Sequence, residues 1–138
     1  MTVDDGLLIF EQQISLPYSY TAGGAQRAAL AGLRDAEIVA STGGGHVVVP
    51  ARPFAADGTH LRDTTALTGE GEIEMVSVAH HLPGAPVYAL IRLDGATTLL
   101  FHRLAPGPDH PSAGDRVRPV WRAERTGSIL DIECFAPA

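Results

Sequence analysis

Histidine and carboxylate side chains are the residues of this sequence most able to do chemistry, and they fall into two groups. His80 and His81 are neighbours, and adjacent side chains on a strand point to opposite faces, so these two rings could not share one metal ion. His46, Asp57 and His60 could hold a metal together, but their separations of 11 and 3 residues match no tetrahedral site with four protein ligands. We therefore predict no metal site, and we place His80 and His81 at a strand end or an interface.

Three carboxylates and one thiol complete the candidate chemistry. Glu70, Glu72 and Glu74 alternate with other residues, so they share one face of a strand, and three like charges on one face more often meet solvent than substrate. Cys134 is the single cysteine and lies on the apolar side of an alternating pattern, which predicts a buried, inert thiol. No Gly-x-Ser-x-Gly sequence is present to activate a serine. We expect no catalytic residue in this chain.

The charge and composition exclude several classes of protein. The chain has 138 residues and a net charge of −6, and all ten of its basic residues are arginine. Without lysine there is no Schiff-base nucleophile and no phosphate-loop lysine, and the acidic balance argues against a nucleic-acid partner. No apolar run approaches the roughly 20 residues of a transmembrane helix. The acidic start Met1-Thr2-Val3-Asp4-Asp5 is unlike a secretory signal, so we expect a cytoplasmic protein with no membrane partner.

Hydrophobic periodicity predicts one short helix near the N-terminus. Alanines and the pair Leu30 and Leu33 recur at helical spacing over about 22–34. Such a short helix is marginal until this apolar face docks on another element. The residues before it, 1–21, are expected to form an arm.

Strands account for the rest of the chain. Two short runs at 37–40 and 46–50 flank the glycines 43–45, which predict a hairpin turn. Five closely spaced candidates follow, at about 69–80, 86–93, 96–104, 115–123 and 128–135. They predict a mainly β chain built on a five-stranded OB-fold barrel, with Asp94-Gly95 as a hairpin turn. The expected organisation is an arm and helix at 1–35, a hairpin segment at 36–66 and an OB-fold domain at 67–138.

Several short motifs occur in a fairly specific order and spacing. They are Leu16-Pro17-Tyr18, Ile38-Val39-Ala40, Val49-Pro50-Ala51-Arg52, Gly69-Glu70-Gly71-Glu72-Ile73, Pro86-Val87-Tyr88-Ala89-Leu90-Ile91-Arg92-Leu93-Asp94-Gly95, Gly114-Asp115-Arg116-Val117 and Phe135-Ala136-Pro137. Together they resemble the family known as domain of unknown function thirty-five, over about residues 16–137. The resemblance implies an N-terminal helical arm, a rubredoxin-like zinc ribbon and an OB-fold, in small proteins that partner thiolase-like enzymes acting on acyl-CoA.

The sequence departs from that family at the zinc ribbon. The family's two cysteine pairs would fall near Ser41 and Gly44 and near Ala55 and Gly58, and none of these is cysteine. We therefore expect a degenerate rubredoxin-like segment of two short hairpins without zinc, held by Val47, Val49, Phe54 and their neighbours. Because a structural metal stabilises the fold around it, docking on a partner is a plausible substitute.

The resemblance implies a non-catalytic accessory subunit of a thiolase-like enzyme, either an acyltransferase or a retro-aldol lyase on acyl-CoA, in steroid or lipid degradation. The resemblance implies that acyl-CoA is the substrate of the complex. The chain itself is expected to bind no cofactor. Aromatic residues, arginines and the two histidines in the arm, helix and loops suit an interface. The expected partner-binding residues are Tyr18, Tyr20, Arg27, Arg52, Phe54, His80 and His81.

Two other interpretations stay open from the sequence. The first is a free-standing OB module that binds acyl-CoA or another small anionic ligand by itself, with arginine meeting the phosphates. The second is an enzyme that uses His80 or His81 with a nearby carboxylate. A catalytic histidine would need a partner in space that the sequence does not reveal.

The missing cysteines predict that the isolated chain holds well under one equivalent of zinc. The physical reason is that no thiolate set remains to bind the ion tightly. Metal analysis of the purified protein measures this directly. A full equivalent of zinc would show that histidines and aspartates have rebuilt the site.

Overall fold

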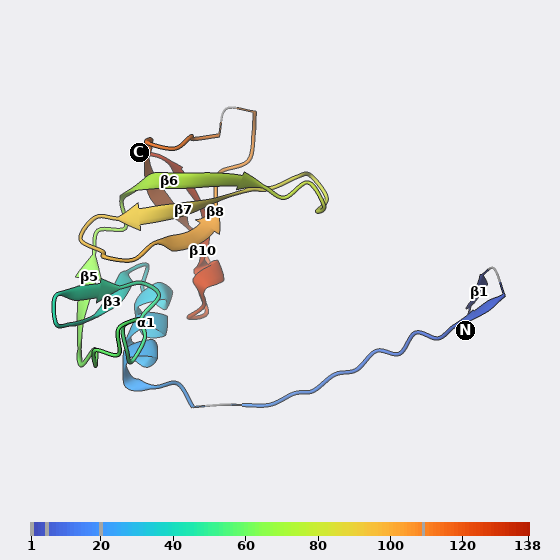
Figure 1. Ribbon diagram of the computed structural model, residues 1–138, viewed down its shortest axis with the longest axis horizontal. Coiled ribbons are helices and arrows are strands. Elements are labelled where there is room, and N and C mark those ends of the chain that lie inside the picture. Colours follow the sequence, from blue (N-terminus) through green and yellow to red (C-terminus); the bar gives the residue numbers. More distant parts are fainter. Residues whose placement is uncertain (1, 5, 20, 109) are drawn as a thin grey trace.

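The computed structural model describes residues 2–4, 6–19, 21–108 and 110–138. One helix and a small three-stranded sheet lie beside a curled five-stranded sheet, and an N-terminal arm runs away from this body (Figure 1). No helix in the described ranges is long and apolar enough to span a bilayer.

The five-stranded sheet is an OB-like, partly closed barrel, as the sequence predicts. Its strands are β6 (Gly71–Val78), β7 (Val87–Leu93), β8 (Leu100–Arg103), β9 (Arg116–Trp121) and β10 (Ile132–Pro137), in the order β10-β9-β6-β7-β8. All neighbours in this sheet pair antiparallel. A parallel bridge between Leu104 and Phe135 joins the two edges, and the Ala105 N–H donates to the Phe135 carbonyl at 2.8 Å. This contact satisfies edge groups that would otherwise be unpaired.

Strand β8 begins four residues later than predicted because the chain first pairs with the small sheet. The turn at Asp94-Gly95 forms as expected, with the Ala96 N–H donating to the Leu93 carbonyl at 3.0 Å. Beyond it, Thr97 exchanges backbone and hydroxyl hydrogen bonds with Val47. The hydroxyl of Thr98 accepts from the Val49 N–H at 2.9 Å. Residues 96–99 therefore connect the barrel to the small sheet.

The small sheet contains a strand that the sequence analysis missed. It consists of β3 (Ile38–Gly43), β4 (His46–Val48) and β5 (Asp63–Leu67), in the order β4-β3-β5. Strand β5 pairs with β3 along its whole length, but four of its five side chains are exposed. An exposed strand lacks the apolar alternation on which strand prediction depends, so the segment offered no signal.

Helix α1 (Gly24–Arg34) confirms the predicted helix. Its buried side is formed by Gly32 and Leu33. A Cβ built on Gly32 would lie 2.7 Å from the Val39 side chain, so only glycine permits this close packing on β3. At the other end of the chain, Arg125 donates to the Arg34 carbonyl at 2.8 Å and satisfies a C-terminal group of the helix.

The last predicted strand starts late because a capped turn precedes it. A 3₁₀ turn, η1 (Ile129–Asp131), occupies the beginning of the predicted range. The buried Asp131 carboxylate accepts the backbone N–H groups of residues 126, 127 and 128 at 2.7 to 3.0 Å. Burial raises the pKa of Asp131, but these hydrogen bonds outweigh it and hold the pKa below its ordinary value.

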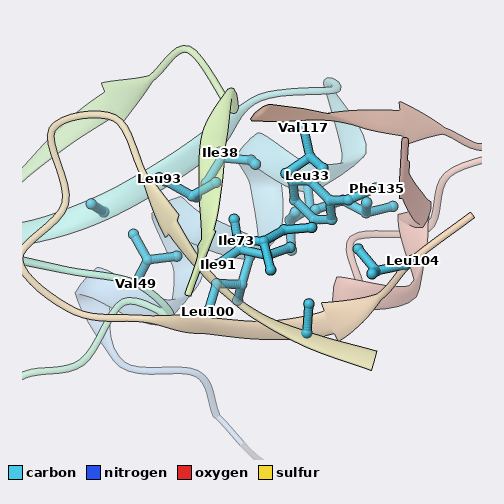
Figure 2. Packing of buried hydrophobic residues seen from close by; sticks show 13 residues of the cluster. Leu33, Ile38, Val49, Ile73, Ile91, Leu93, Leu100, Leu104, Val117 and Phe135 are labelled. Carbon is cyan, nitrogen blue, oxygen red and sulfur yellow. The ribbon is translucent and has the colours of Figure 1, made fainter. Parts of the chain in front are cut away.

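One hydrophobic cluster joins the helix, the small sheet and the barrel (Figure 2). Leu33 of α1 and Ile38 of β3 contribute to the same cluster as Ile73, Ile91 and Phe135 of the barrel. These side chains are at most 7% exposed. The small sheet and the barrel therefore share one core.

The described residues of the N-terminal arm contain two short strands that were not predicted. Strands β1 (Thr2–Asp4) and β2 (Leu7–Ile9) form a hairpin at its far end. Residues 10–19 form neither helix nor strand, and the arm extends away from the body (Figure 1).

Replacing the fully buried Phe135 by alanine should lower the free energy of unfolding by about 3–5 kcal/mol, because the core loses an aromatic side chain and keeps a cavity. Chemical denaturation measures the loss. The matched control is Leu130→Ala, at a side chain of η1 that is 63% exposed, which should change stability by less than about 0.5 kcal/mol. Equal effects of the two substitutions would contradict this description of the core.

Candidate interaction surfaces

An apolar groove lies where the helix, the small sheet and the barrel meet. It has a volume of about 780 Å³. We call it the junction groove, and it is lined by Ala22, Gln26, Ala29, Leu30, Leu33, Ile38, Val39, Val49, Pro50, Ala51, Arg52, Leu99, Leu100, Phe101, Gly127, Ser128 and Ile129. A groove of this size and composition is suited to binding an apolar group.

Arg52 is the one charged residue among the lining residues of the junction groove. Its backbone N–H donates to the buried Ser41 hydroxyl at 2.9 Å, which fixes the start of the side chain. Within the described part of the chain its guanidinium makes no ion pair with a carboxylate. An exposed arginine beside an apolar groove favours an occupant that carries a negative charge.

The outer face of the barrel carries an exposed apolar patch that continues from the junction groove. We call it the sheet patch, made of Met75, Tyr88, Leu90 and Phe101, which lie on neighbouring positions of β6, β7 and β8. Tyr88 and Phe101 stack with ring centroids 5.2 Å apart. Met75 is 61% and Phe101 59% exposed, and Phe101 also lines the groove. The sequence analysis missed this patch, although outward-facing aromatic residues on adjacent strands were a visible signal.

A second hollow lies on the other side of the helix. Gly24, Ala25 and Ala28 of α1 face residues 60–64 and Pro53 across it, and its volume is about 640 Å³. We call it the helix hollow. The exposed Arg27 lies on the same stretch of helix, and Phe54 follows Pro53 on the opposite wall. Two predicted partner-binding residues are therefore next in the chain to residues that line this hollow.

The degenerate ribbon forms the two short hairpins that the sequence predicts. The first is the β3–β4 hairpin, and the second brings Phe54 and His60 together through a bridge. The ring of Phe54 stacks on the ring of His60 with centroids 4.9 Å apart. Because the Phe54 side chain is 54% exposed, this stacked pair presents a fixed aromatic surface to solvent.

An ion pair joins the tips of these two hairpins. His46 Nε2 lies 2.9 Å from Asp57 Oδ2, and the Thr59 N–H donates to Asp57 Oδ1 at 3.0 Å. Hydrogen bonds from Thr59 and from His46 lower the pKa of Asp57 to about 2. The tips approach so closely that a Cβ on Gly44 would lie 2.8 Å from the Thr59 methyl group. Polar contacts therefore hold the tips together here.

The residues at the four positions where the resemblance would place cysteine do not fit a zinc ion. Ser41 is buried and its hydroxyl accepts a backbone hydrogen bond. Gly44, Ala55 and Gly58 have no side-chain atom that could coordinate a metal ion. Across the described residues, no group of three or more histidine, cysteine, aspartate or glutamate side chains could hold a metal. Of the three ligands considered together, His46 and Asp57 meet, but the His60 ring is held separately and accepts from Arg62 Nε at 3.2 Å.

His80 and His81 do not lie on a strand. Strand β6 ends at Val78, and both histidines are exposed in the turn that leads to β7. The argument that their rings point to opposite faces therefore does not apply, because it requires strand geometry. They lie at the outer end of the β6–β7 hairpin, which projects from the barrel (Figure 1).

The two predicted tyrosines belong to the arm. Tyr18 is 80% exposed, whereas Tyr20 lies outside the described residues. The seven predicted partner-binding residues thus come from the arm, the helix, the ribbon and the β6–β7 turn. Arg52 lines the junction groove, whereas Arg27 and Phe54 are each next in the chain to a residue that lines the helix hollow.

The carboxylates of the first barrel strand face solvent, as predicted. Glu70, Glu72 and Glu74 are all exposed. Glu74 accepts from Arg92 Nε at 2.9 Å, and Arg116 binds both oxygens of Asp94 and lies 3.8 Å from Glu70. The Glu74–Arg92 pair joins the neighbouring strands β6 and β7, and exposed pairs of this kind stabilise a sheet modestly.

Cys134 is buried on β10, in agreement with the sequence pattern. Burial, with a smaller contribution from the charge of Glu133, raises the pKa of its thiol above the ordinary value. A raised pKa leaves little thiolate at neutral pH, so the thiol is a poor nucleophile.

The fold of this chain is shared with a solved protein. A chain in the structure of the Ltp2-ChsH2(DUF35) aldolase has the same fold, with a TM-score of 0.64 and 21% sequence identity, over 86% of this chain and 98% of that chain. No family model and no curated protein matches the sequence. The resemblance to the domain of unknown function thirty-five family is thus confirmed at the level of the fold.

The His46–Asp57 pair should make stability sensitive to acid. A lowered folded-state pKa means that the unfolded chain binds the proton more readily, so the contribution of Asp57 is present above its ordinary pKa of 3.8 and is lost as pH falls towards about 2. Thermal unfolding of wild-type protein and Asp57→Asn across this range tests it. The difference in melting temperature should be largest above pH 4 and vanish near pH 2.

The matched control for this experiment is Asp63→Asn, at an exposed aspartate on β5 for which the structure shows no side-chain ion pair within the described residues. It should leave the acid profile unchanged. A difference between Asp57→Asn and wild type that is constant from pH 7 to pH 2 would contradict the role assigned to this ion pair.

Proposed function

We propose that this chain is a non-catalytic accessory subunit of an aldolase or thiolase-like enzyme complex. The observation that carries the proposal is the fold it shares, over 98% of the other chain, with a chain of the Ltp2-ChsH2(DUF35) aldolase. Shared fold alone is an analogy and does not assign a function. The surfaces of the chain must therefore support the same conclusion.

The exposed surfaces of this chain suit binding better than catalysis. Apolar and aromatic side chains are exposed in the sheet patch and at the Phe54–His60 stack, and such residues are enriched in protein interfaces. Two of the groups capable of chemistry are engaged elsewhere: His46 pairs with Asp57, and Cys134 is buried with a raised pKa. This distribution supports a subunit that recognises another protein.

The helix hollow is the surface that we assign to the enzyme subunit. Its lining combines small residues of α1 with His60, Arg62 and Asp63 on the opposite wall. The exposed Arg27 and Phe54 are each next in the chain to a lining residue. Arginine and aromatic residues are over-represented among the residues that dominate binding energy. Tyr18, Tyr20, His80 and His81 extend this proposed contact surface from the arm and the β6–β7 turn.

The finer parts of the proposal come from the family resemblance. We propose that the complex acts on an acyl-CoA in the breakdown of steroids or other lipids, in the cytoplasm, as a retro-aldol lyase or an acyltransferase. The chain contributes no cofactor to this reaction in our proposal.

Affinity purification of the tagged chain from its native host, with identification of the captured protein, tests the assignment. An aldolase or thiolase-like subunit in stoichiometric amount is the expected result. Recovery with an unrelated enzyme would contradict it.

Substitutions around the helix hollow should weaken the complex without unfolding the subunit. Arg27→Ala and Phe54→Ala should each raise the dissociation constant by about tenfold, because exposed arginine and aromatic residues contribute most at an interface. Titration calorimetry with the captured subunit provides the measurement. Arg118→Ala, at an exposed arginine on β9, is the control and should leave binding unchanged. Unchanged affinity for both test variants would place the interface elsewhere.

One observation favours a second candidate function. The junction groove is apolar and has an unpaired arginine among its lining residues, within the described part of the chain, which would suit an acyl-CoA bound by this chain alone. Calorimetry of the isolated chain with an acyl-CoA decides between the two. Tight binding without a partner would favour this alternative.

A further inference from the structure

We propose that the N-terminal arm of one copy of this chain occupies the junction groove of a second copy, which returns its own arm, so that two copies form a symmetric dimer by arm exchange. This inference goes beyond the proposed accessory function and does not depend on it. It rests on the match between two surfaces of the same chain.

The arm presents large apolar side chains to solvent. Six of them are between 40% and 76% exposed: Leu7, Leu8, Ile9, Phe10, Ile14 and Leu16. Soluble proteins rarely leave so many apolar residues uncovered in one short segment. Residues 10–19 also form no helix or strand. The apolar side chains of the arm are therefore suited to burial against another surface.

The charges of the arm and of the groove are complementary. Glu11 is the single charged residue in 6–19, and Arg52 is the single charged residue that lines the groove. Neither side chain makes an ion pair with any described residue. An arm lying in the groove would bring one acidic and one basic group to an otherwise apolar contact, where they fix its register.

The position of the arm favours a second copy over the chain's own groove. Ala22, just before the helix, lines one end of the groove, yet the arm leaves the body here and extends away from it (Figure 1). Leu16 precedes a proline, which keeps this part of the backbone extended. The arm would have to reverse within a few residues to reach its own groove. Exchange between two copies needs no such reversal.

The surface available is large enough for a stable dimer. At roughly 100 Å² for each large apolar side chain, two exchanged arms and the surfaces they cover would bury on the order of 2,000 Å². Ten extended residues span about 33 Å, so the arm can pass along the groove and onto the adjoining sheet patch. Phe101 belongs to both surfaces and makes this path continuous.

Charge reversal in the full-length chain tests the proposal. Sedimentation analysis of the purified wild-type protein at micromolar concentration should show a dimer. Glu11→Arg and Arg52→Glu should each raise the dimer dissociation constant at least about tenfold, because each places two like charges together. The double variant restores the pair with its charges exchanged, and its dissociation constant should return to nearly the wild-type value. Arg118→Glu, on the exposed face of β9, is the control and should have no effect.

Several results would overturn the inference. These are a monomeric wild-type chain at high concentration, a dimer that neither single variant weakens, and a double variant that fails to recover. A monomer whose arm is protected from proteolysis would show instead that the arm folds onto its own groove. Because only the purified chain is used, failure here leaves the proposed accessory function untouched, and capture of an unrelated enzyme leaves arm exchange untouched.

Discussion

The shared hydrophobic cluster is the constraint on which the rest of the structure depends. Leu33 of the helix, Ile38 of the small sheet and Phe135 of the barrel belong to one buried group. A helix of 11 residues and a three-stranded sheet would each be marginal alone. Packing on the barrel stabilises both, and the junction groove lies along the line where the three units meet. The binding surfaces are therefore consequences of how the core is assembled.

The same core explains how a ribbon without cysteines keeps its shape. The two hairpin tips are joined by the His46–Asp57 pair, and a small second cluster of Val48, Ala55 and Leu61 lies beneath them. Hydrogen bonds from Thr97 and Thr98 attach β4 and the residues after it to the barrel. Each contact is weaker than a metal centre. Together they hold the hairpins in position through neighbours that are already fixed by the core.

Local patterns predicted the elements that bury one face. The helix and the five barrel strands were visible because apolar residues recur at a period set by the backbone, and the buried position of Cys134 followed from that alternation. Strand β5 was not predicted because its side chains are exposed and show no apolar alternation. The end of β6 before His80 was not predicted because a turn and a strand end look alike in sequence. Pairing between distant segments, such as His46 with Asp57, has no local signal at all.

The candidate surfaces show the same limit. Arg27, Arg52 and Phe54 were chosen from the sequence by residue type, but only the tertiary structure shows that Arg52 lines the junction groove. The Tyr88–Phe101 stack was overlooked because each aromatic residue was considered separately from its cross-strand neighbour. Of the reactive side chains, His46 pairs with Asp57 and Cys134 is buried, while His80 and His81 remain exposed in the β6–β7 turn.

Reconstitution tests that account most directly. The captured aldolase or thiolase-like subunit would be assayed for turnover alone, with this chain, and with this chain as the sole protein. The account predicts that this chain alone is inactive and that the activity of the enzyme subunit depends on its presence. Turnover by the isolated chain, freed of any partner, would contradict it.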